Sequence, residues 1–449
     1  MRIIYFDIDC LRPDHLGCYG YARPTSPMID SIAKDGTVFQ RAYCASSPCL
    51  PSRTSLVSGR FGIRNGVCSN VRSGAQFHLR EKDYGGPCDD NELFPRQLRR
   101  GGLDTIAISN FADRHAAYYF MAGWSEYLTP NLKAGMETAV EVNEVAMDWL
   151  THHAGRDNFY LHINYWDTHR PYKMDQSWAD RMRDHPVAQT WPDAQTIRQH
   201  RHIDGPFTAA WQFEDGKSPY KLMPDGVFSR EDFEHMLTGY DASIAYVDHH
   251  IGQVLKKLKD NHMLEDTAII ISSDHGDAFG EHGIYSDHVC ADECIHHIPL
   301  IIKWPGLKSG QTCKAMLYNI DIAPTVCDLL GYDIPTDWDG LSFRKQLEGG
   351  AGERRQYLVW DHGLYAVQRA VRTQRYLMMK TYDDMGYGFD DIALYDMDND
   401  PYQTRNIATQ EPEALNECLS MLDRWTLAQY KKGYVENDPL LEILKERAR

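Results

Sequence analysis

The chain has 449 residues, of which 43% are hydrophobic and 25% charged, which is the composition of a water-soluble globular protein. Its length suits one large domain with a smaller one beside it. The net charge of -17 and the lack of any apolar run as long as a membrane span argue against nucleic-acid and membrane partners.

Short apolar segments alternate with helix-like stretches along most of the chain. The five predicted core strands cover Ile3–Ile8, Thr105–Ser109, Phe159–Asn164, Thr267–Ser272 and Pro299–Ile302. Apolar residues at helical spacing predict long helices over Glu137–His153 and Arg230–Lys259. This alternation predicts an α/β fold with a large, mainly parallel sheet sandwiched by helices.

The pattern changes from Tyr357 onward, where short strands and turns precede one helix. The expected elements are strands over Tyr365–Arg369, Gln374–Lys380 and Ala393–Tyr395, and a helix over Glu411–Tyr430. We therefore predict a catalytic α/β domain over residues 1–350 and a smaller C-terminal α+β subdomain over residues 351–449. The polar stretch 176–228 is either a lid or binding loop of the first domain or a surface insertion.

Polar residues follow four of the predicted strands. They are Asp9 after the first, Asn110 after the second, Asp167 and His169 after the third, and Asp274 and His275 after the fourth. Because sites in parallel α/β folds gather beyond the carboxyl ends of the strands, four such clusters predict one shared site.

The segment Cys49–Arg60 carries the strongest chemical signal. Pro51 is suited to open a helix and Gly59 to end it, which puts Cys49 just before a helix N-terminus that favours anions. One turn on, Arg53 brings a permanent positive charge beside Cys49. We expect this placement to acidify the thiol and to orient an oxyanion ester toward it.

The same segment, Cys-x-Pro-x-Arg followed by Thr-Ser-Leu-x-Ser-Gly, resembles the signature of the type I sulfatases of the alkaline phosphatase superfamily. Further segments resemble that family in the same order, namely Asp9–Gly20, Asp274–Gly283, Arg372-Thr373 and Leu394–Pro401. The resemblance implies a hydrolase that acts on sulfuric esters. It also implies a separate maturation enzyme that converts Cys49 to formylglycine, whose hydrated diol attacks sulfur and then expels sulfate.

One divalent metal ion is also implied by the resemblance, bound by Asp9, Asp274, His275 and the diol at residue 49. Oxygen ligands suit Ca²⁺, whereas the imidazole of His275 shifts the preference toward Mn²⁺. Many family members have a second aspartate where this chain has Cys10, and many sulfatases have asparagine in place of His275. A histidine there resembles the phosphonate monoester hydrolase branch, so hydrolysis of phosphonate monoesters or phosphodiesters is the alternative function. Asp7 shares a strand face with Asp9 and is either a partner of the metal site or a structural acid.

The implied catalytic residues beyond Cys49 are Arg53, His169 and His288. His169 matches a His-x-Pro segment, which implies a contact to sulfate or protonation of the leaving oxygen. The lysine that usually contacts the leaving group is missing, and His288 is nearest to its place, with Asp287 as the competing alignment and a candidate substrate contact. Arg114 and His115 match a Lys-x-His pair loosely and are candidates for sulfate or sugar contacts, or surface residues.

The substrate that we expect is a small sulfated saccharide, since an acidic chain disfavours long polyanions. Trp166, Trp191 and Trp211 lie in or near the polar stretch, where they either stack on sugar rings or pack in the core. A two-metal phosphatase fits less well because its nucleophile is Ser or Thr. A non-catalytic binding protein fits less well because the nucleophile and ligands are all present.

Two features of the sequence bear on the compartment. The first residues, Met1 to Asp7, have the pattern of a buried strand, and no signal peptide is visible. Eleven cysteines without a framework spacing indicate free thiols and a reducing environment. We therefore expect a cytoplasmic protein, and leave open whether it forms homo-oligomers.

Overall fold

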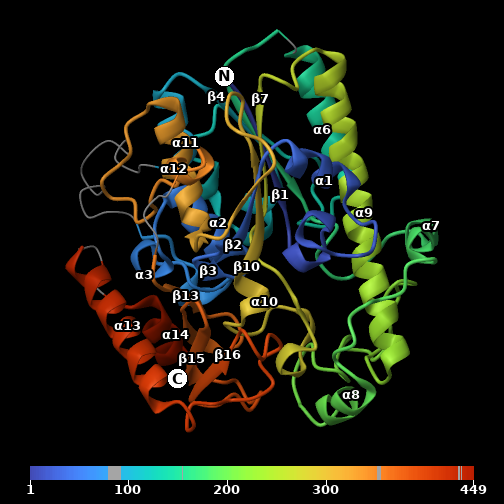
Figure 1. The fold of residues 1–449 in the computed structure, drawn as a ribbon, viewed down its shortest axis with the longest axis vertical. Helices are drawn as coiled ribbons and strands as arrows, with labels where there is room; N and C mark the ends of the chain where they lie inside the picture. The colour runs from blue at the N-terminus through green and yellow to red at the C-terminus, as the bar shows by residue number, and fades with distance from the viewer. Residues whose placement is uncertain (79–92, 154, 351–354, 433–434, 436) are drawn as a thin grey trace.

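The computed structural model describes residues 1–78, 93–153, 155–350, 355–432, 435 and 437–449. Within them, a nine-stranded sheet runs through the centre of the larger part (Figure 1). Its strands are β1 (Arg2–Ile8), β2 (Thr37–Tyr43), β4 (Asp104–Ile108), β5 (Glu126–Leu128), β6 (Phe159–Tyr165), β7 (Thr267–Ser273), β10 (His297–Lys303), β11 (Gln311–Cys313) and β12 (Leu317–Tyr318).

The strand order is β11-β2-β10-β7-β1-β6-β4-β5, with β12 also paired to β2. Only β10 is antiparallel to its neighbours, β7 and β2, and every other pairing in the sheet is parallel. The prediction of a mainly parallel sheet is therefore confirmed, and each of the five predicted strands is present within two residues of its expected bounds.

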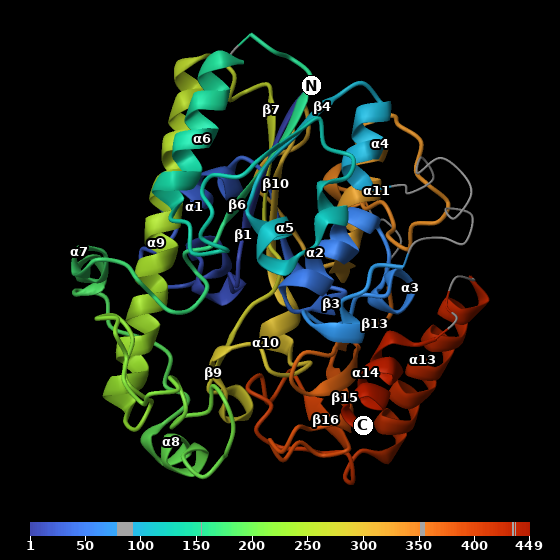
Figure 2. The same ribbon diagram turned by 180° about the vertical axis from the view of Figure 1, so that it is seen from behind.

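Helices cover both faces of this sheet (Figure 1, Figure 2). One layer holds α1 (Pro27–Lys34), α6 (Ala139–His152) and α9 (Arg230–Asp260), and the other holds α2 (Cys49–Ser58), α4 (Phe94–Arg100), α5 (Phe111–His115), α11 (Ile322–Leu330) and α12 (Arg344–Leu347). Strand alternation sends Phe6 of β1 into the core under α9 and Tyr5 into the core under α2. Asp7 follows Tyr5 by the same period of two, so it faces the layer that contains Cys49.

A second sheet of five strands has the order β16-β15-β14-β13-β3. It comprises β3 (Ser46–Ser47), β13 (Leu358–His362), β14 (Val367–Arg372), β15 (Tyr376–Asp383) and β16 (Ile392–Asp396). The helices α13 (Pro412–Lys431) and α14 (Pro439–Arg447) pack against β14. Strand β3 comes directly before α2, so the small sheet is hydrogen-bonded to the segment that leads into Cys49. The division at residue 350 stays a prediction, and residues 351–354 lie outside the described residues.

The stretch 176–228 contains two short helices, α7 (Gln176–Ala179) and α8 (Ala194–His200), joined by irregular backbone. Helix α8 lies at the same end of the molecule as the small sheet, whereas α7 lies beside α9 (Figure 1). The remaining short α-helices and strands are α3 (Gly62–Asn65), α10 (Glu293–His296), β8 (Ala278–Phe279) and β9 (Tyr285–Asp287), and several 3-10 turns lie between the elements. Across the described ranges, no helix combines the length and the apolar character needed to cross a bilayer, and the ten cysteines there are free thiols.

Candidate active site

Helix α2 places the candidate nucleophile at its start. Cys49 is the first residue of the helix rather than the residue before it, and it is buried. Gly59 ends the helix at φ 64°, in the left-handed region that favours glycine. The first turn of the helix offers few free N–H groups, because Pro51 has none, the Leu50 N–H donates to Asn70 Oδ1 at 3.1 Å and the Ser52 N–H donates to the Pro48 oxygen at 3.0 Å.

Asp9, Asp274 and His275 surround Cys49. Strands β1 and β7 are parallel neighbours in which Ile8 pairs with Ser273, so the residues that follow them leave the sheet side by side. One ligand atom from each of these four residues lies within 4.8 Å of the others. The Cys49 sulfur is 3.2 Å from His275 Nε2.

Arg53 lies between the carboxylates of this cluster and is itself almost fully buried. Its Nη1 donates to Asp9 Oδ2 at 2.8 Å and to Asp274 Oδ2 at 2.6 Å. Its Nε and Nη2 donate to both oxygens of Asp7, at 2.7 and 2.9 Å. The imidazole of His162 contacts Asp7 at 3.1 Å. Asp7 thus holds the guanidinium in place, which is the role of a partner of the site rather than of an isolated structural acid.

The cluster has more negative than positive charge. Three carboxylates share the one guanidinium of Arg53. Burial raises the pKa of Asp274, and the neighbouring carboxylates of Asp9 and Asp7 add to this effect against the pull of Arg53. Because a buried excess of negative charge is costly, a further cation is needed before all three acids can ionise together.

The sequence-based prediction that the Cys49 thiol is acidified is wrong for the unmodified cysteine. Burial raises the pKa of this thiol well above its usual value, and the carboxylates of Asp9 and Asp274 raise it further. The positive charge of Arg53 only partly offsets them because that charge is shared among three acids. The protein groups around Cys49 by themselves therefore disfavour its thiolate form.

The side chains around Cys49 do fit a divalent cation. Two carboxylates, one imidazole and residue 49 converge on one buried point, which is the kind of ligand set that Mn²⁺, Mg²⁺ or Ca²⁺ takes in proteins. The uncompensated carboxylate charge is a second argument for a cation there. These residues form a group that can hold a metal ion, and its identity is a separate question.

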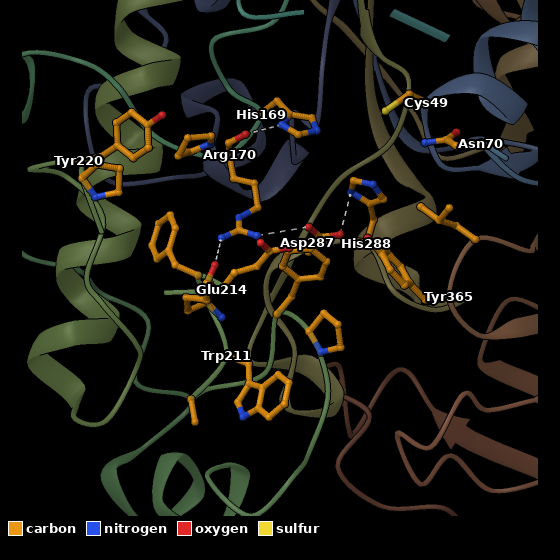
Figure 3. A pocket seen from close by; sticks show the side chains of 18 of the residues that line it. Cys49, Asn70, His169, Arg170, Trp211, Glu214, Tyr220, Asp287, His288 and Tyr365 are labelled. Carbon is orange, nitrogen blue, oxygen red and sulfur yellow. Dashed lines mark hydrogen bonds and ion pairs between the residues drawn. The ribbon is translucent and has the colours of Figure 1, made fainter. Parts of the chain in front are cut away.

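A cavity of about 1180 Å³ opens above this cluster (Figure 3). Its walls come from the end of β6, the stretch 206–220, the loop after β9 and the turn between β13 and β14. Among the lining residues are Cys49, Asn70, Arg114, His169, Arg170, Trp211, Gln212, Glu214, Tyr220, Asp287, His288 and Tyr365. The stretch 176–228 therefore contributes a wall of this cavity, as a binding loop does. The volume is sufficient for a sugar unit with its substituents.

Two histidines reach this cavity close to Cys49. Burial lowers the pKa of His169, and its Nε2 lies 3.3 Å from Arg114 Nη2. Burial by itself also lowers the pKa of His288, but the charges of Asp287 and Asp277 more than offset it and raise that pKa to about 9. At neutral pH the site therefore holds a neutral imidazole at His169 and a cationic one at His288.

Of the other three predicted substrate contacts, two line the cavity and one does not. Arg114 lines the cavity, and its guanidinium lies 5.1 Å over the ring of Trp166. Asp287 lines it as well, 3.8 Å from Arg170. His115 is not among the cavity-lining residues, and its ring packs on Phe111 at 4.9 Å.

The three tryptophans also differ from one another. Trp211 lines the cavity and is 58% exposed, so it can stack on a ligand. Trp166 is buried beneath Arg53, at 5.1 Å. Trp191 stacks on Tyr402 at 4.3 Å, outside the cavity.

The sequence interpretation did not anticipate Arg170 and Tyr365. Arg170 lies between the rings of Phe207 and Phe213, at 4.6 and 5.4 Å, and donates to the backbone of Gln212. Its position directly after His169 was a signal available in the sequence. Nothing in the pattern around Tyr365 shows that the second sheet reaches the cavity, because only the packing of the two sheets brings it there.

The fold is that of the alkaline phosphatase superfamily. The family model described as Sulfatase matches residues 2–332, and the model described as N-sulphoglucosamine sulphohydrolase, C-terminal, matches residues 280–428. The chain belongs to the sulfatase family, and it is a hydrolase that acts on sulfuric esters.

Two similar proteins match this chain over nearly all of its length and over most of their own. An N-acetylglucosamine-6-O-sulfatase from Bacteroides thetaiotaomicron is 23% identical over 98% of this chain and 87% of its own length. An arylsulfatase from Clostridium perfringens is 23% identical over 98% of this chain and 97% of its own.

Solved structures share the fold across both sheets. A structure in complex with its substrate D-glucosamine-2-N,6-O-disulfate superimposes with a TM-score of 0.76 at 21% identity, over 98% of this chain and 99% of that one. The phosphonate monoester hydrolase of Agrobacterium radiobacter superimposes with a TM-score of 0.71 at 20% identity, over 96% of each chain.

Proposed function

We propose that this sulfatase removes sulfate from a small sulfated saccharide, using a formylglycine that a maturation enzyme makes from Cys49. The observation that carries the proposal is the convergence of residue 49 with Asp9, Asp274 and His275 beneath a cavity that His169 and His288 line.

One divalent cation would be held by Asp9, Asp274, His275 and the modified residue 49. When bound, it would lower the pKa of the residue-49 hydroxyl and stabilise negative charge on the sulfuryl group. The imidazole of His275 favours Mn²⁺ or a similar ion over Ca²⁺. Arg53 supplies fixed positive charge beside the same atoms, and Asp7 sets its orientation through two hydrogen bonds.

A hydrated formylglycine at residue 49 would supply two hydroxyl groups, one to bond to sulfur and one to expel sulfate by elimination. When the first hydroxyl bonds to sulfur, its proton would pass to the solvent, the bond from sulfur to the alcohol oxygen would break, and His288 would donate a proton to that oxygen. When sulfate leaves, His169 would accept the proton of the second hydroxyl. Water added to the resulting aldehyde would restore the diol, and exchange with the solvent would return both histidines to their starting protonation states.

The two histidines and Arg114 have distinct tasks in this scheme. His288 is cationic at neutral pH, so it can donate a proton to the leaving oxygen. His169 is the neutral imidazole, which can accept the proton of the second hydroxyl. Arg114 lies against His169 and is placed to contact the sulfate oxygens.

A saccharide is supported by the outer part of the cavity. Figure 3 shows Cys49, His169 and His288 at one end, with Trp211 and Tyr220 farther out. Exposed aromatic rings stack on the apolar faces of sugars, and Glu214 and Asp287 can accept hydrogen bonds from hydroxyl groups. The similarity to an N-acetylglucosamine-6-O-sulfatase supports the same substrate class.

The experiment that tests the proposal is the peptide mass of residue 49, with sulfate release from a panel of sulfated sugars measured on the same preparation. We expect the mass of formylglycine, and sulfate release that is lost in Cys49→Ala. An unmodified cysteine in active protein would overturn the formylglycine step. Modified protein that releases sulfate from aryl sulfates but from no sugar in the panel would overturn the substrate class.

The second candidate activity is hydrolysis of phosphonate monoesters or phosphodiesters at the same site. The observation that favours it is His275, an imidazole where many sulfatases have asparagine. Matched nitrophenyl esters of sulfate and phenylphosphonate distinguish the two activities. A larger kcat/KM for the sulfate supports our proposal, and a larger value for the phosphonate replaces it.

The metal is tested by removing it with a chelator and restoring one ion at a time. We expect activity to fall to background after chelation and to return further with Mn²⁺ than with Ca²⁺. Full recovery with Ca²⁺ alone would show that His275 does not set the metal preference. Activity that survives complete removal of metal would contradict a role for any cation.

A further inference from the structure

A second group of metal-ligating side chains lies beside the first. Cys10, His275, Asp277 and His288 each place one ligand atom within 4.8 Å of the others, and all four are buried. They come from the loop after β1, the loop after β7 and the loop after β9. His275 is common to both groups, and the remaining three ligands are not used to hold the cation proposed for hydrolysis.

The second group has an unused buried ligand atom and a strained backbone. One oxygen of Asp277 contacts His288 Nδ1 at 3.0 Å, whereas its Oδ2 is buried with no hydrogen-bond partner among the described residues. An unpaired carboxylate oxygen in a buried site normally indicates a missing ion or donor. Cys10 has a φ of 53°, in a region that side chains other than glycine rarely adopt and that clusters at functional sites.

The ligand types differ between the two groups. The group around Asp9 and Asp274 has two carboxylates, which suit hard cations. The group around Cys10 combines one thiol with two imidazoles and one carboxylate, the four-ligand combination that Zn²⁺ takes in tetrahedral sites. The rings of His275 and His288 lie only 4.4 Å apart, close enough for one ion to contact both.

We propose that Cys10, His275, Asp277 and His288 form a second metal site, which binds Zn²⁺ or another thiophilic divalent cation and thereby inhibits the enzyme. On metal binding, the Cys10 thiol and the cationic His288 each lose a proton to the buffer, since thiolate and neutral imidazole are the forms that ligate metal. The carboxylate and imidazole nitrogens complete the coordination without any ligand from outside the chain.

Inhibition follows from the shared imidazole. His275 Nδ1 is engaged with the backbone oxygen of Gly276 at 2.8 Å, so only Nε2 is free to bind a metal. One nitrogen cannot bind two ions at once, and the two sites therefore compete for it. A thiophilic cation bound by Cys10 also withdraws His288 from the cavity, where the proposed reaction needs it as a proton donor.

The site is tested by Co²⁺ titration in the Cys49→Ala variant, in which Cys10 is the only thiol in either group. Cobalt bound to thiolate produces a strong near-ultraviolet charge-transfer band, which oxygen and nitrogen ligands do not produce. We expect this band in Cys49→Ala, its loss when Cys10→Ser is added, and its retention when Cys18→Ser is added instead. Cys18 is the matched control because it lies in the same segment but outside both groups.

This titration needs no activity, so its outcome is independent of the proposed sulfatase reaction. Cobalt that binds Cys49→Ala without the band, or a band that persists after Cys10→Ser, would overturn the site. Circular dichroism checks that each variant is folded. If Cys10→Ser fails to fold, Cys10→Asp replaces it, because it restores the acid that many family members have there while removing the thiol.

The inhibitory effect is tested on matured enzyme with Cys49 intact. We expect Zn²⁺ to inhibit the wild-type enzyme and added Mn²⁺ to relieve the inhibition by competition. Cys10→Ser should raise the half-inhibiting Zn²⁺ concentration at least about tenfold, since loss of even an outer partner of a metal ligand acts on that scale, whereas Cys18→Ser should leave it unchanged. Equal Zn²⁺ sensitivity in all three proteins would overturn the inhibitory role.

Discussion

Two buried arginines in this protein each bind carboxylates, and they differ in ways that separate a reactive site from a structural one. Arg53 in α2 forms ion pairs with Asp7, Asp9 and Asp274, whereas Arg369 in β14 forms ion pairs with Asp361 and Asp438. Both arginine residues are 3% exposed or less. The comparison shows that a buried ion cluster is not by itself evidence of function.

The number of acids and the access to a cavity distinguish the two clusters. Three acids share Arg53, and residue 49 beside them lines the large cavity. Two acids share Arg369, which lies under the ring of Trp425 and beneath α14, and it is not among the lining residues of the large cavity. The cluster with the greater excess of negative charge therefore lies where a cation and a substrate can enter. The ion pairs of the other cluster hold α14 against the small sheet.

The largest effect is expected for Arg53→Gln. The change removes the positive charge beside residue 49 and leaves Asp7 without its bidentate partner. We expect kcat/KM for an aryl sulfate to fall by about 10³-fold, the scale of losing one preorganised charge at the reacting atoms. Added Mn²⁺ should raise the melting temperature of this variant more than that of the wild type, because the freed carboxylates include two of the metal ligands. A rate within tenfold of the wild type would show that Arg53 is structural, like Arg369.

The second effect is expected for Arg369→Gln, the same substitution in the other cluster. Removing one partner of a buried ion pair costs about 3–5 kcal/mol of unfolding free energy, since Asp361 and Asp438 lose their counter-charge. We expect a lower denaturation midpoint in urea, with kcat/KM changed less than twofold where the protein is folded. Mn²⁺ should not restore this loss beyond the shift that it gives the wild type. Loss of activity in folded Arg369→Gln would contradict the structural role assigned to the Arg369 cluster.

The third effect concerns the cationic histidine of the cavity. The pKa of His288 is about 9, above its usual value, so the charged form is favoured in the fold. Its contribution to stability is therefore fully present below about pH 6.5 and is lost as the pH rises through about 9. The rate should fall over the same alkaline range because the proton donor is lost. His288→Gln should lower kcat by about 10²–10³-fold and remove this alkaline decline. A pH–rate profile in the variant that keeps the decline would assign it to another group.

The smallest effect is expected at the outer wall. Trp211 is 58% exposed and touches no group of the ion cluster, so Trp211→Ala should not change the chemical step. We expect KM for a sulfated sugar to rise about fivefold to tenfold, the equivalent of about 1–1.5 kcal/mol of aromatic contact. KM for a nitrophenyl sulfate should stay nearly constant and serves as the control. An equal rise for both substrates would mean that Trp211 shapes the cavity rather than contacts the sugar.

Much of the fold was predictable because local patterns encode it. Apolar strand segments alternate with helical periodicity, and Pro51 and Gly59 mark the ends of α2 by their backbone preferences. The same patterns could not show that β10 is antiparallel or that Ser46–Ser47 joins the second sheet, because strand pairing depends on distant parts of the chain. A two-residue strand such as β3 leaves no periodicity to detect.

The candidate site, like the fold, was predictable from the sequence only in part. The sequence by itself determined the sulfatase signature at Cys49 and the acids and histidines beyond the strands, because these residues are local consequences of strand ends and of a helix start. Only the tertiary structure decided how the charge of Arg53 is shared, and so reversed the expected effect on the Cys49 thiol. It also decided that Cys10 meets Asp277 and His288, residues more than 260 positions away along the chain. The physical reason is that pKa values and ligand groups depend on which buried charges come within a few ångströms of one another, and chain folding alone sets those distances.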